Sequence, residues 1–281
     1  MAIEKLPSTG DAPRSTGVPA SLVPGGEADS AGFPWSGRDF DHHGTAFADD
    51  DGETPEEWRA RVAAVRAAVD PEAQAAAQAE ALLALSRTRL LIPLLAEAGE
   101  LGLTPEGRTV EKTQELSIVT VAAPDGRRAM PVFSSVAAMH HWNPESRPVP
   151  VPGPQVALAA AQEGTAIVII DPGTPEQEFG VRRTQLEAMA VGRRILPAWA
   201  DPEVLEAFRA SLAAEPRALA VELLAGDPQA RLLEAEAIVI LTLEPGLDRE
   251  ELRGLLEALQ RRWAASEIIA ERVDSLRVRV R

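Results

Sequence analysis

The chain has 281 residues, of which 45% are hydrophobic and 25% charged, and its formal net charge is −15. These values are typical of one large or two ordinary globular domains, and the negative charge disfavours binding to nucleic acid or anionic lipid. The absence of cysteine excludes disulfides and thiolate-ligated metal sites and suits a reducing cytoplasm. No window approaches the ~20 apolar residues of a membrane span and no signal-peptide run opens the chain, so we expect a cytoplasmic protein without nucleic-acid or membrane partners.

Residues 1–53 are predicted to be an acidic tail. They hold 3 basic and 10 acidic side chains, a net charge of −7. Residues 1–32 have no hydrophobic period, which predicts disorder because too little apolar surface is available to offset the ordering entropy.

The tail nevertheless contains an aromatic stretch, "FPWSGRDFDHHGTAFADDDG", at residues 33–52. Burying Trp35 and Phe40 alone would contribute roughly 3 kcal/mol or more. The stretch, with Arg38 between these rings, is therefore predicted to be a docking segment. It would dock on the chain's own globular part, on a second copy or on a partner protein.

Two helices are predicted to follow the tail. "TPEE" at 54–57 is typical of a helix start, with Thr54 as N-cap and Glu57 closing a capping box. Asp70 before Pro71 predicts the start of a second, alanine-rich helix.

A sheet is predicted over the next hundred residues. "TRLLIPLL" at 88–95 contains Pro93, which predicts an edge strand or a strand end. Residues 115–133 give two strand-like runs on either side of Gly126, which predicts an antiparallel hairpin. Further elements are expected in the following order: a helix at 136–142 capped by Ser134 or Ser135, a possible strand at 147–152, a helix at 154–164, strands at 165–173 and 177–183, and a helix at 184–191 capped by Thr184.

Residues 193–281 are predicted to form a smaller α+β domain. The expected order is βαββαβ, which is the order of a ferredoxin-like unit, and its first strand is "RRILPAW" at 193–199. The predicted domains are therefore 1–53, 54–192 and 193–281.

Several motifs in the middle of the chain are distinctive. They are "SRTRLLIPLL" at 86–95, Glu111-Lys112 before the hairpin, "PDGRRAMPVFSS" across it, Trp142, and Asp171-Pro172 after an apolar strand. With these motifs, residues 80–191 resemble the N-terminal domain of the SseB ("enhanced serine sensitivity") family in its actinobacterial form. The resemblance implies an α/β to α+β fold, a mixed sheet with flanking helices. It implies no reaction, cofactor or catalytic residue.

Clusters of serine, histidine and aspartate are candidates for a catalytic or a metal site. A helix that starts after Ser135 places His140 and His141 on other faces than the serine, and no glycines flank the serines. N-capping is therefore the favoured role of the serines. The His-His pairs and Asp49–Asp51 fit no metal-ligand spacing, so no metal and no cofactor are expected.

Arginines form the clearest surface pattern. Arg277, Arg279 and Arg281 share one face of the last strand, which predicts either a half-buried edge strand or a surface for an acidic partner. Glu111, Lys112, Arg127 and Arg128 are expected to gather at the hairpin, as ion pairs or as a binding surface.

We expect a non-enzymatic cytoplasmic binding or adaptor protein. The candidate binding residues are Trp35, Arg38, Phe40, Glu111, Lys112, Arg127, Arg128, Trp142, Asp171, Arg182 and Arg183. The alternative is an enzyme with a pocket between the two domains that uses Ser135, Asp171 or Glu111, and a third possibility is structural self-assembly. A concave polar pocket that joins those three residues would favour the enzyme.

Overall fold

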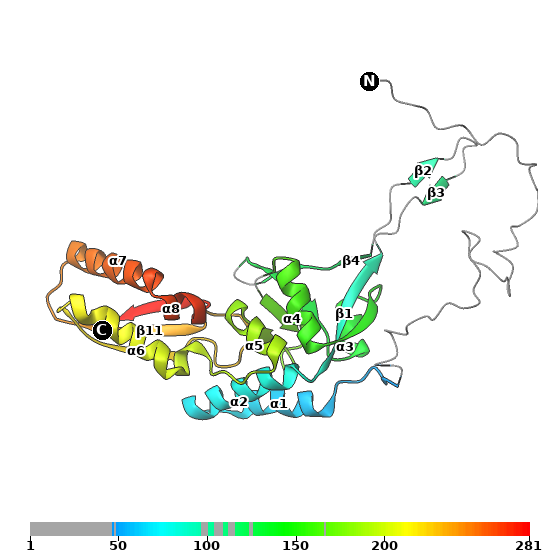
Figure 1. Ribbon diagram of the computed structural model, residues 1–281, viewed down its shortest axis with the longest axis horizontal. Helices are drawn as coiled ribbons and strands as arrows, with labels where there is room; N and C mark the ends of the chain where they lie inside the picture. The colour runs from blue at the N-terminus through cyan, green and yellow to red at the C-terminus, as the bar shows by residue number, and fades with distance from the viewer. Residues whose placement is uncertain are drawn as a thin grey trace, which may run out of the picture. The chain divides into compact units, whose positions relative to one another are not determined.

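Two helices lead into the first sheet (Figure 1). In the computed structural model, which describes residues 47, 49–96, 101–103, 109–111, 116–123, 126–165 and 167–281, α1 spans Glu56–Ala67 and α2 spans Pro71–Leu85. Asp70 caps α2 as predicted, because its side chain accepts a hydrogen bond from Ala73 N at 2.9 Å. The predicted cap at Thr54 is wrong: Pro55 is the N-cap residue, and the Thr54 hydroxyl instead lies 2.9 Å from Ser134 Oγ.

The chain divides into two units, Met1–Asp49 and Asp50–Arg281, and every helix and strand named below lies in the second. Its first sheet has the order β4 (Leu116–Ile118), β1 (Arg89–Ala96), β7 (Arg147–Pro152), and both pairings are antiparallel. The prediction that β1 is an edge strand is therefore wrong.

Local geometry explains why β1 tolerates Pro93. Leu91 exchanges both backbone hydrogen bonds with Phe133, at 2.8 and 2.9 Å, and so its backbone groups point away from β7. Pro93, two residues on, points the same way. It lies opposite Pro148 of β7, and β4 begins to pair only at Leu94, so the missing N–H leaves no β7 or β4 acceptor unpaired.

The second sheet has the order β5 (Val121–Ala122), β6 (Arg128–Val132), β8 (Ile167–Ile170), β9 (Phe179–Val181). The predicted hairpin is present between β5 and β6, and Gly126 adopts the positive φ of 83° that its turn requires. The first predicted run is split, because β4 pairs with β1 instead. Strands β6 and β8 are parallel, so their carboxyl ends lie side by side.

A separate two-stranded sheet pairs β2 (Leu101–Leu103) with β3 (Thr109–Glu111). Glu111 therefore lies in a different sheet from the β5–β6 hairpin, and Lys112 lies outside the described residues. The expected gathering of these two residues with Arg127 and Arg128 stays a prediction.

Three helices complete this part of the chain: α3 (Val136–Trp142), α4 (Gly153–Gln162) and α5 (Leu186–Val191), the last preceded by the 3-10 turn η3 (Arg183–Gln185). Ser135 caps α3 as predicted, accepting a hydrogen bond from Ala138 N at 3.1 Å. Thr184 does not cap α5. The Gln185 side chain instead accepts a hydrogen bond from Arg182 N, so the 3-10 turn η3 precedes α5.

The last third contains α6 (Pro202–Ser211), β10 (Ala218–Ala225), β11 (Ala237–Leu243), α7 (Arg249–Ala265), α8 (Glu267–Arg272) and β12 (Leu276–Val280), with the short 3-10 turns η4 (Ala198–Ala200) and η5 (Leu212–Ala214). The strand predicted at 193–199 is absent. Its Pro197 has no N–H to donate, and the N–H of Ala198 bonds to the Glu236 carboxylate at 3.1 Å instead of to a strand. The order is thus αββααβ, without the first strand of a ferredoxin-like unit.

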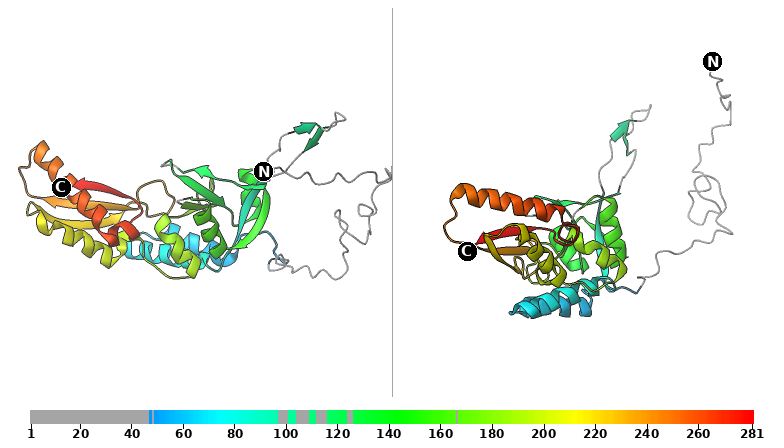
Figure 2. Two further views of the ribbon diagram at one scale, coloured as in Figure 1. Left: turned by 45° about the horizontal axis from the view of Figure 1, so that its top comes forward. Right: turned by 60° about the vertical axis from the view of Figure 1, so that its left-hand side comes forward.

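The last three strands form a sheet in the order β10, β11, β12, and Figure 2 shows α7, in orange, running over these strands. One face packs on α6, α7 and α8 through a cluster that includes Val239, Leu241 and the edge-to-face pair Phe208–Trp263, with ring centroids 5.2 Å apart. A larger cluster, which includes Trp58, Met130 and Phe179, fills the region between α1, α2 and the first two sheets. The expected α/β to α+β class is confirmed, while the boundary at residue 192 stays a prediction.

None of the described helices is long and apolar enough to cross a membrane.

Candidate functional site

A buried polar cluster lies at the carboxyl ends of β6 and β8. Asp171, directly after β8, is fully buried and has a positive φ of 50°. Its Oδ1 accepts a hydrogen bond from Ser134 N at 2.7 Å and its Oδ2 accepts one from Ser134 Oγ at 2.6 Å. Burial raises the pKa of Asp171 to about 6, although both bonds from Ser134 oppose the rise.

The segment from Asp50 to Thr54 lies against this cluster. Arg89, which is buried, bonds both carboxylate oxygens of Asp50 and donates to the carbonyls of Glu53 and Ser134 at 2.8 and 2.7 Å. Val136 N donates to Gly52 O at 2.8 Å. The acidic run thus already has a cationic partner within the chain. Trp35, Arg38 and Phe40 lie outside the described residues, so docking of the aromatic stretch stays a prediction.

The cap role of Ser135 gives a modest expected effect. Ser135→Ala removes the acceptor for Ala138 N and is expected to lower the free energy of unfolding by about 1 kcal/mol, measured by urea denaturation. Ser135→Thr keeps the acceptor and should lose less than half of that. If the alanine variant were as stable as the wild type, Ser135 would not be stabilising α3.

A second charged network joins residues far apart in the chain. Arg182, only 4% exposed, donates to Asp227 Oδ2 at 2.7 Å and to Asp274 Oδ2 at 3.3 Å. Arg127 donates to both oxygens of Asp274 at 2.9 Å. Burial opposes ionisation of Asp274, but the bonds from Arg127 and Arg182 outweigh it and lower its pKa. Both arginines therefore bind carboxylates of the chain itself, which is a structural role.

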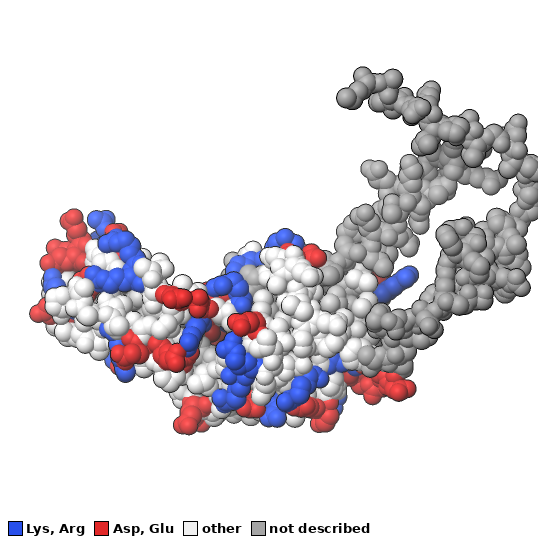
Figure 3. Space-filling model, viewed as in Figure 1, with Lys and Arg blue, Asp and Glu red and all other residues white. Residues whose placement is uncertain are grey.

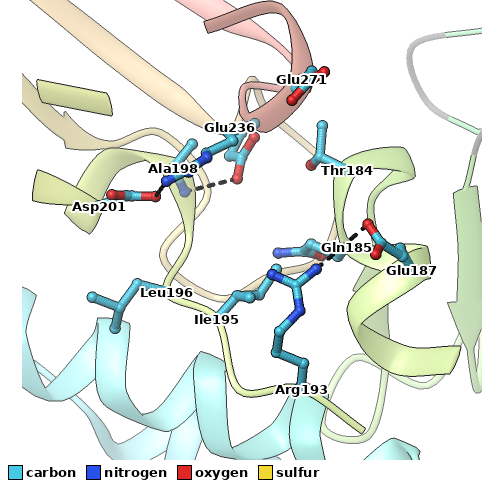
Figure 4. A pocket seen from close by; sticks show the side chains of 11 residues that line it. Thr184, Gln185, Glu187, Arg193, Ile195, Leu196, Ala198, Asp201, Glu236 and Glu271 are labelled. Atoms are coloured by element: carbon cyan, nitrogen blue, oxygen red, sulfur yellow. Dashed lines mark hydrogen bonds and ion pairs between the residues drawn. The ribbon is translucent and has the colours of Figure 1, made fainter. Parts of the chain in front are cut away.

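A pocket of about 300 Å³ adjoins this network (Figure 4). Its lining comes from both sides of the predicted boundary at residue 192. The polar lining is Thr184, Gln185, Glu187, Arg193, Asp201, Glu236, Glu271 and Arg272, and the apolar lining is Ile195, Leu196 and Ala198. Ser135, Asp171 and Glu111 are not among these residues, so the pocket does not join the three residues of the enzyme hypothesis.

Glu236 and Thr184 are the most unusual groups of this pocket. Glu236 is 3% exposed, and its two oxygens accept hydrogen bonds from Ala198 N at 3.1 Å and Asp274 N at 2.9 Å. Burial raises the pKa of this carboxyl, and the two backbone bonds oppose the rise. Thr184 Oγ1 is buried and has no hydrogen-bond partner among the described residues.

The face of the β10–β12 sheet opposite α6–α8 is open. The register places Glu222, Leu224, Ile238, Ile240, Arg277, Arg279 and Arg281 on this surface, which we call the open sheet face. None of these side chains belongs to a hydrophobic cluster among the described residues, but Ile240 is buried, with 9% of its surface exposed. Arg277 pairs with Glu234 and Arg281 with Glu222, while Arg279 has no ion pair in the part of the chain that the structure describes.

The remaining predicted residues play smaller roles. Arg128 is exposed and bonds Thr120 Oγ1 at 3.4 Å, and Arg183 is exposed and donates to Ala270 O at 3.3 Å. Trp142 is half-buried and packs on Phe133, with ring centroids 5.4 Å apart. These three side chains do not meet in one site. In the described ranges, no group of three His, Asp or Glu side chains is arranged to hold a metal ion.

Charges of both signs mix over α6, α7 and α8 on the face shown in Figure 3, whereas the surface over α4 is largely uncharged. Many arginines pair locally, such as Arg272 with Asp201 and Glu203 at 3.1 and 2.7 Å. Sequence reasoning missed Asp227, Glu236 and Asp274. It found Arg89 only as part of the motif at 86–95 and Thr184 only as a helix cap.

Comparison with protein-family models matches residues 62–188 to the SseB protein N-terminal domain. This confirms the resemblance, while its actinobacterial form stays a prediction. No curated protein and no solved structure matches the chain.

Proposed function

The chain carries an SseB protein N-terminal domain, and we propose that it is a non-enzymatic cytoplasmic adaptor that binds an acidic segment of a partner protein on the open sheet face. The observation that carries the proposal is this face itself, which combines three arginines with the apolar side chains of Leu224 and Ile238.

The apolar part of the face offers contact area. Leu224 is 45% exposed, whereas core-facing side chains of the same sheet such as Val239 and Leu241 are fully buried. A hollow of about 190 Å³ at one end of the face is lined by Gly226, Glu234, Ala235, Ile238, Arg277 and Arg279. Such a hollow suits one apolar anchor side chain of a partner.

The charged part of the face favours an acidic partner. Arg279 is unpaired within the described ranges, and the pairs of Arg277 and Arg281 are about half exposed. Exposed ion pairs contribute at most about 1 kcal/mol, so carboxylates of a partner can replace Glu234 and Glu222 at little cost. We therefore infer a partner segment in which carboxylates flank an apolar anchor.

A partner protein fits this face better than the chain's own tail does. The acidic run that ends the tail is already engaged elsewhere, since Asp50 binds Arg89 and Gly52 O accepts from Val136 N. An adaptor role also accords with the placement of Ser135 as a helix cap and of Asp171 as a fully buried carboxyl.

Site-specific photocrosslinking tests the proposal in the full chain. A photoreactive amino acid at Leu224 should yield one crosslinked partner in cells, and the captured peptide should be acidic and contain an apolar side chain. The matched control is Leu158 on α4, which is 57% exposed and lies on another surface. It should not yield that partner.

Charge reversal then separates specific binding from random capture. Arg279→Glu should lower the crosslinking yield at Leu224 at least about fivefold, while Arg261→Glu, at an exposed position of α7, should leave it unchanged. Capture of residues 33–52 of this chain would assign the face to its own tail and overturn the adaptor proposal. An equal yield in the two arginine variants would also overturn it.

A further inference from the structure

We propose that the pocket of Figure 4 binds a small organic cation, a primary alkylammonium or alkylguanidinium ion. The pocket shares no residue with the open sheet face, so this inference is independent of the adaptor proposal. Its volume of about 300 Å³ lies at the lower end of the range for small-molecule sites.

The charged groups that line the pocket have a net negative charge. Four carboxylates and two guanidinium groups contribute to the lining. Arg193 is paired with Glu187 at 3.4 Å, and Arg272 is paired with Asp201 and, outside the lining, with Glu203. Glu236 and Glu271 have no ion pair within the described ranges. A ligand that neutralises this surplus has to be cationic.

Glu236 has capacity for such a ligand. A carboxylate oxygen accepts up to two hydrogen bonds, and each oxygen of Glu236 receives only one, from Ala198 N or from Asp274 N. Burial disfavours the charged form of this side chain, as its raised pKa shows. Arg182 already acts electrostatically on Glu236, and a bound ammonium or guanidinium group would add a direct charge-assisted hydrogen bond in a place that water reaches poorly.

Thr184 adds a second polar group that faces the same space. Figure 4 shows its hydroxyl pointing into the pocket from the side opposite Asp201. Because Thr184 Oγ1 is buried and unpartnered among the described residues, a ligand N–H donor would remove an unfavourable unpaired group. Two oxygens that approach from different elements favour a ligand with two or three N–H groups.

The apolar lining indicates what the rest of the ligand is. Ile195, Leu196 and Ala198 form one stretch of the wall, in the segment between α5 and α6. A short alkyl chain attached to the cationic group would cover this wall. The expected ligand class is therefore an aliphatic amine or guanidine, rather than a metal ion or an inorganic anion.

The test is a titration of the full-length protein with n-butylammonium and n-butylguanidinium, followed by the methyl NMR signals of Ile195 and Leu196. Both cations should shift these signals in a saturable way. The anion pentanoate and the neutral alcohol n-pentanol, which have similar chain lengths, should bind at least about tenfold more weakly. Absence of saturable shifts with both cations, or equal shifts with pentanoate, would overturn the proposal.

Three variants locate the site. Glu236→Gln, which keeps the shape of the side chain, should weaken binding of n-butylammonium at least about tenfold. Thr184→Val should weaken it about threefold, and this variant keeps the test informative if Glu236→Gln fails to fold. Glu267→Gln, on α8 but outside the pocket, is the matched control and should bind as the wild type does. Unchanged binding in Thr184→Val and in a folded Glu236→Gln variant would contradict the assignment.

Discussion

Replacing Arg182 by methionine is expected to lower the free energy of unfolding by about 3–5 kcal/mol. Methionine fills a similar volume but takes the guanidinium away from Asp227 and Asp274, whose side chains are 6% and 1% exposed. Breaking a buried ion pair from one side is costly because the remaining carboxylates are desolvated without full compensation. Urea denaturation at neutral pH measures the loss.

The neighbouring arginine provides the matched control. Arg183 is exposed and makes one 3.3 Å bond, to Ala270 O, so Arg183→Met should change stability by less than about 0.5 kcal/mol. If Arg182→Met lowered the free energy of unfolding by less than about 1 kcal/mol, the charged network would not contribute strongly to the stability of the fold.

Replacing Asp171 by asparagine is expected to change how stability depends on pH. The pKa of Asp171 is raised from 3.8 to about 6 by burial, so the folded wild type holds a proton that the unfolded chain has already released between these values. The contribution of Asp171 to the free energy of unfolding of the wild type should therefore fall by up to about 3 kcal/mol as the pH rises from 4 to above 6. The asparagine side chain is neutral throughout and lacks this loss.

Asparagine also suits the position structurally. It tolerates the positive φ of 50°, and its amide oxygen can accept the bond from Ser134 N. The measurement is urea denaturation at several pH values from 4 to 8, in which the stability of Asp171→Asn relative to the wild type should increase as the pH rises from 4 and level off above pH 6. Asp51→Asn, at an exposed position, serves as the control. A difference that is the same at all pH values would mean that folding does not raise the pKa of Asp171.

The helices and most strands could be predicted because their signals are local. Asp70 and Ser135 cap helices as expected, and Gly126 adopts the positive φ of the hairpin turn. Two failed predictions, the Thr54 cap and the strand at 193–199, concern groups whose hydrogen bonds go to distant parts of the chain. Thr54 bonds Ser134, and Ala198 N bonds Glu236, and neither partner can be identified from neighbouring residues.

The candidate sites were less predictable than the fold. Arg127 and Arg182 were predicted to be binding residues, but they converge on Asp274, which lies about ninety residues from Arg182 in sequence. The Ser134–Asp171 contact follows from the parallel pairing of β6 and β8, which α3, β7 and α4 separate in the chain. The pocket depends on four separate segments, which no single motif reveals.

The prolines of β7 restrict strand pairing between molecules at this edge of the sheet. Val149 and Val151 lie opposite Ile92 and Leu90, whose backbone groups face β7, so Pro148, Pro150 and Pro152 occupy the alternate positions that face outward. A strand arriving from a second molecule would meet carbonyls but no N–H donors along this edge. Strand-by-strand polymerisation, the route to amyloid-like fibres, is therefore blocked at β7 even when the protein is concentrated.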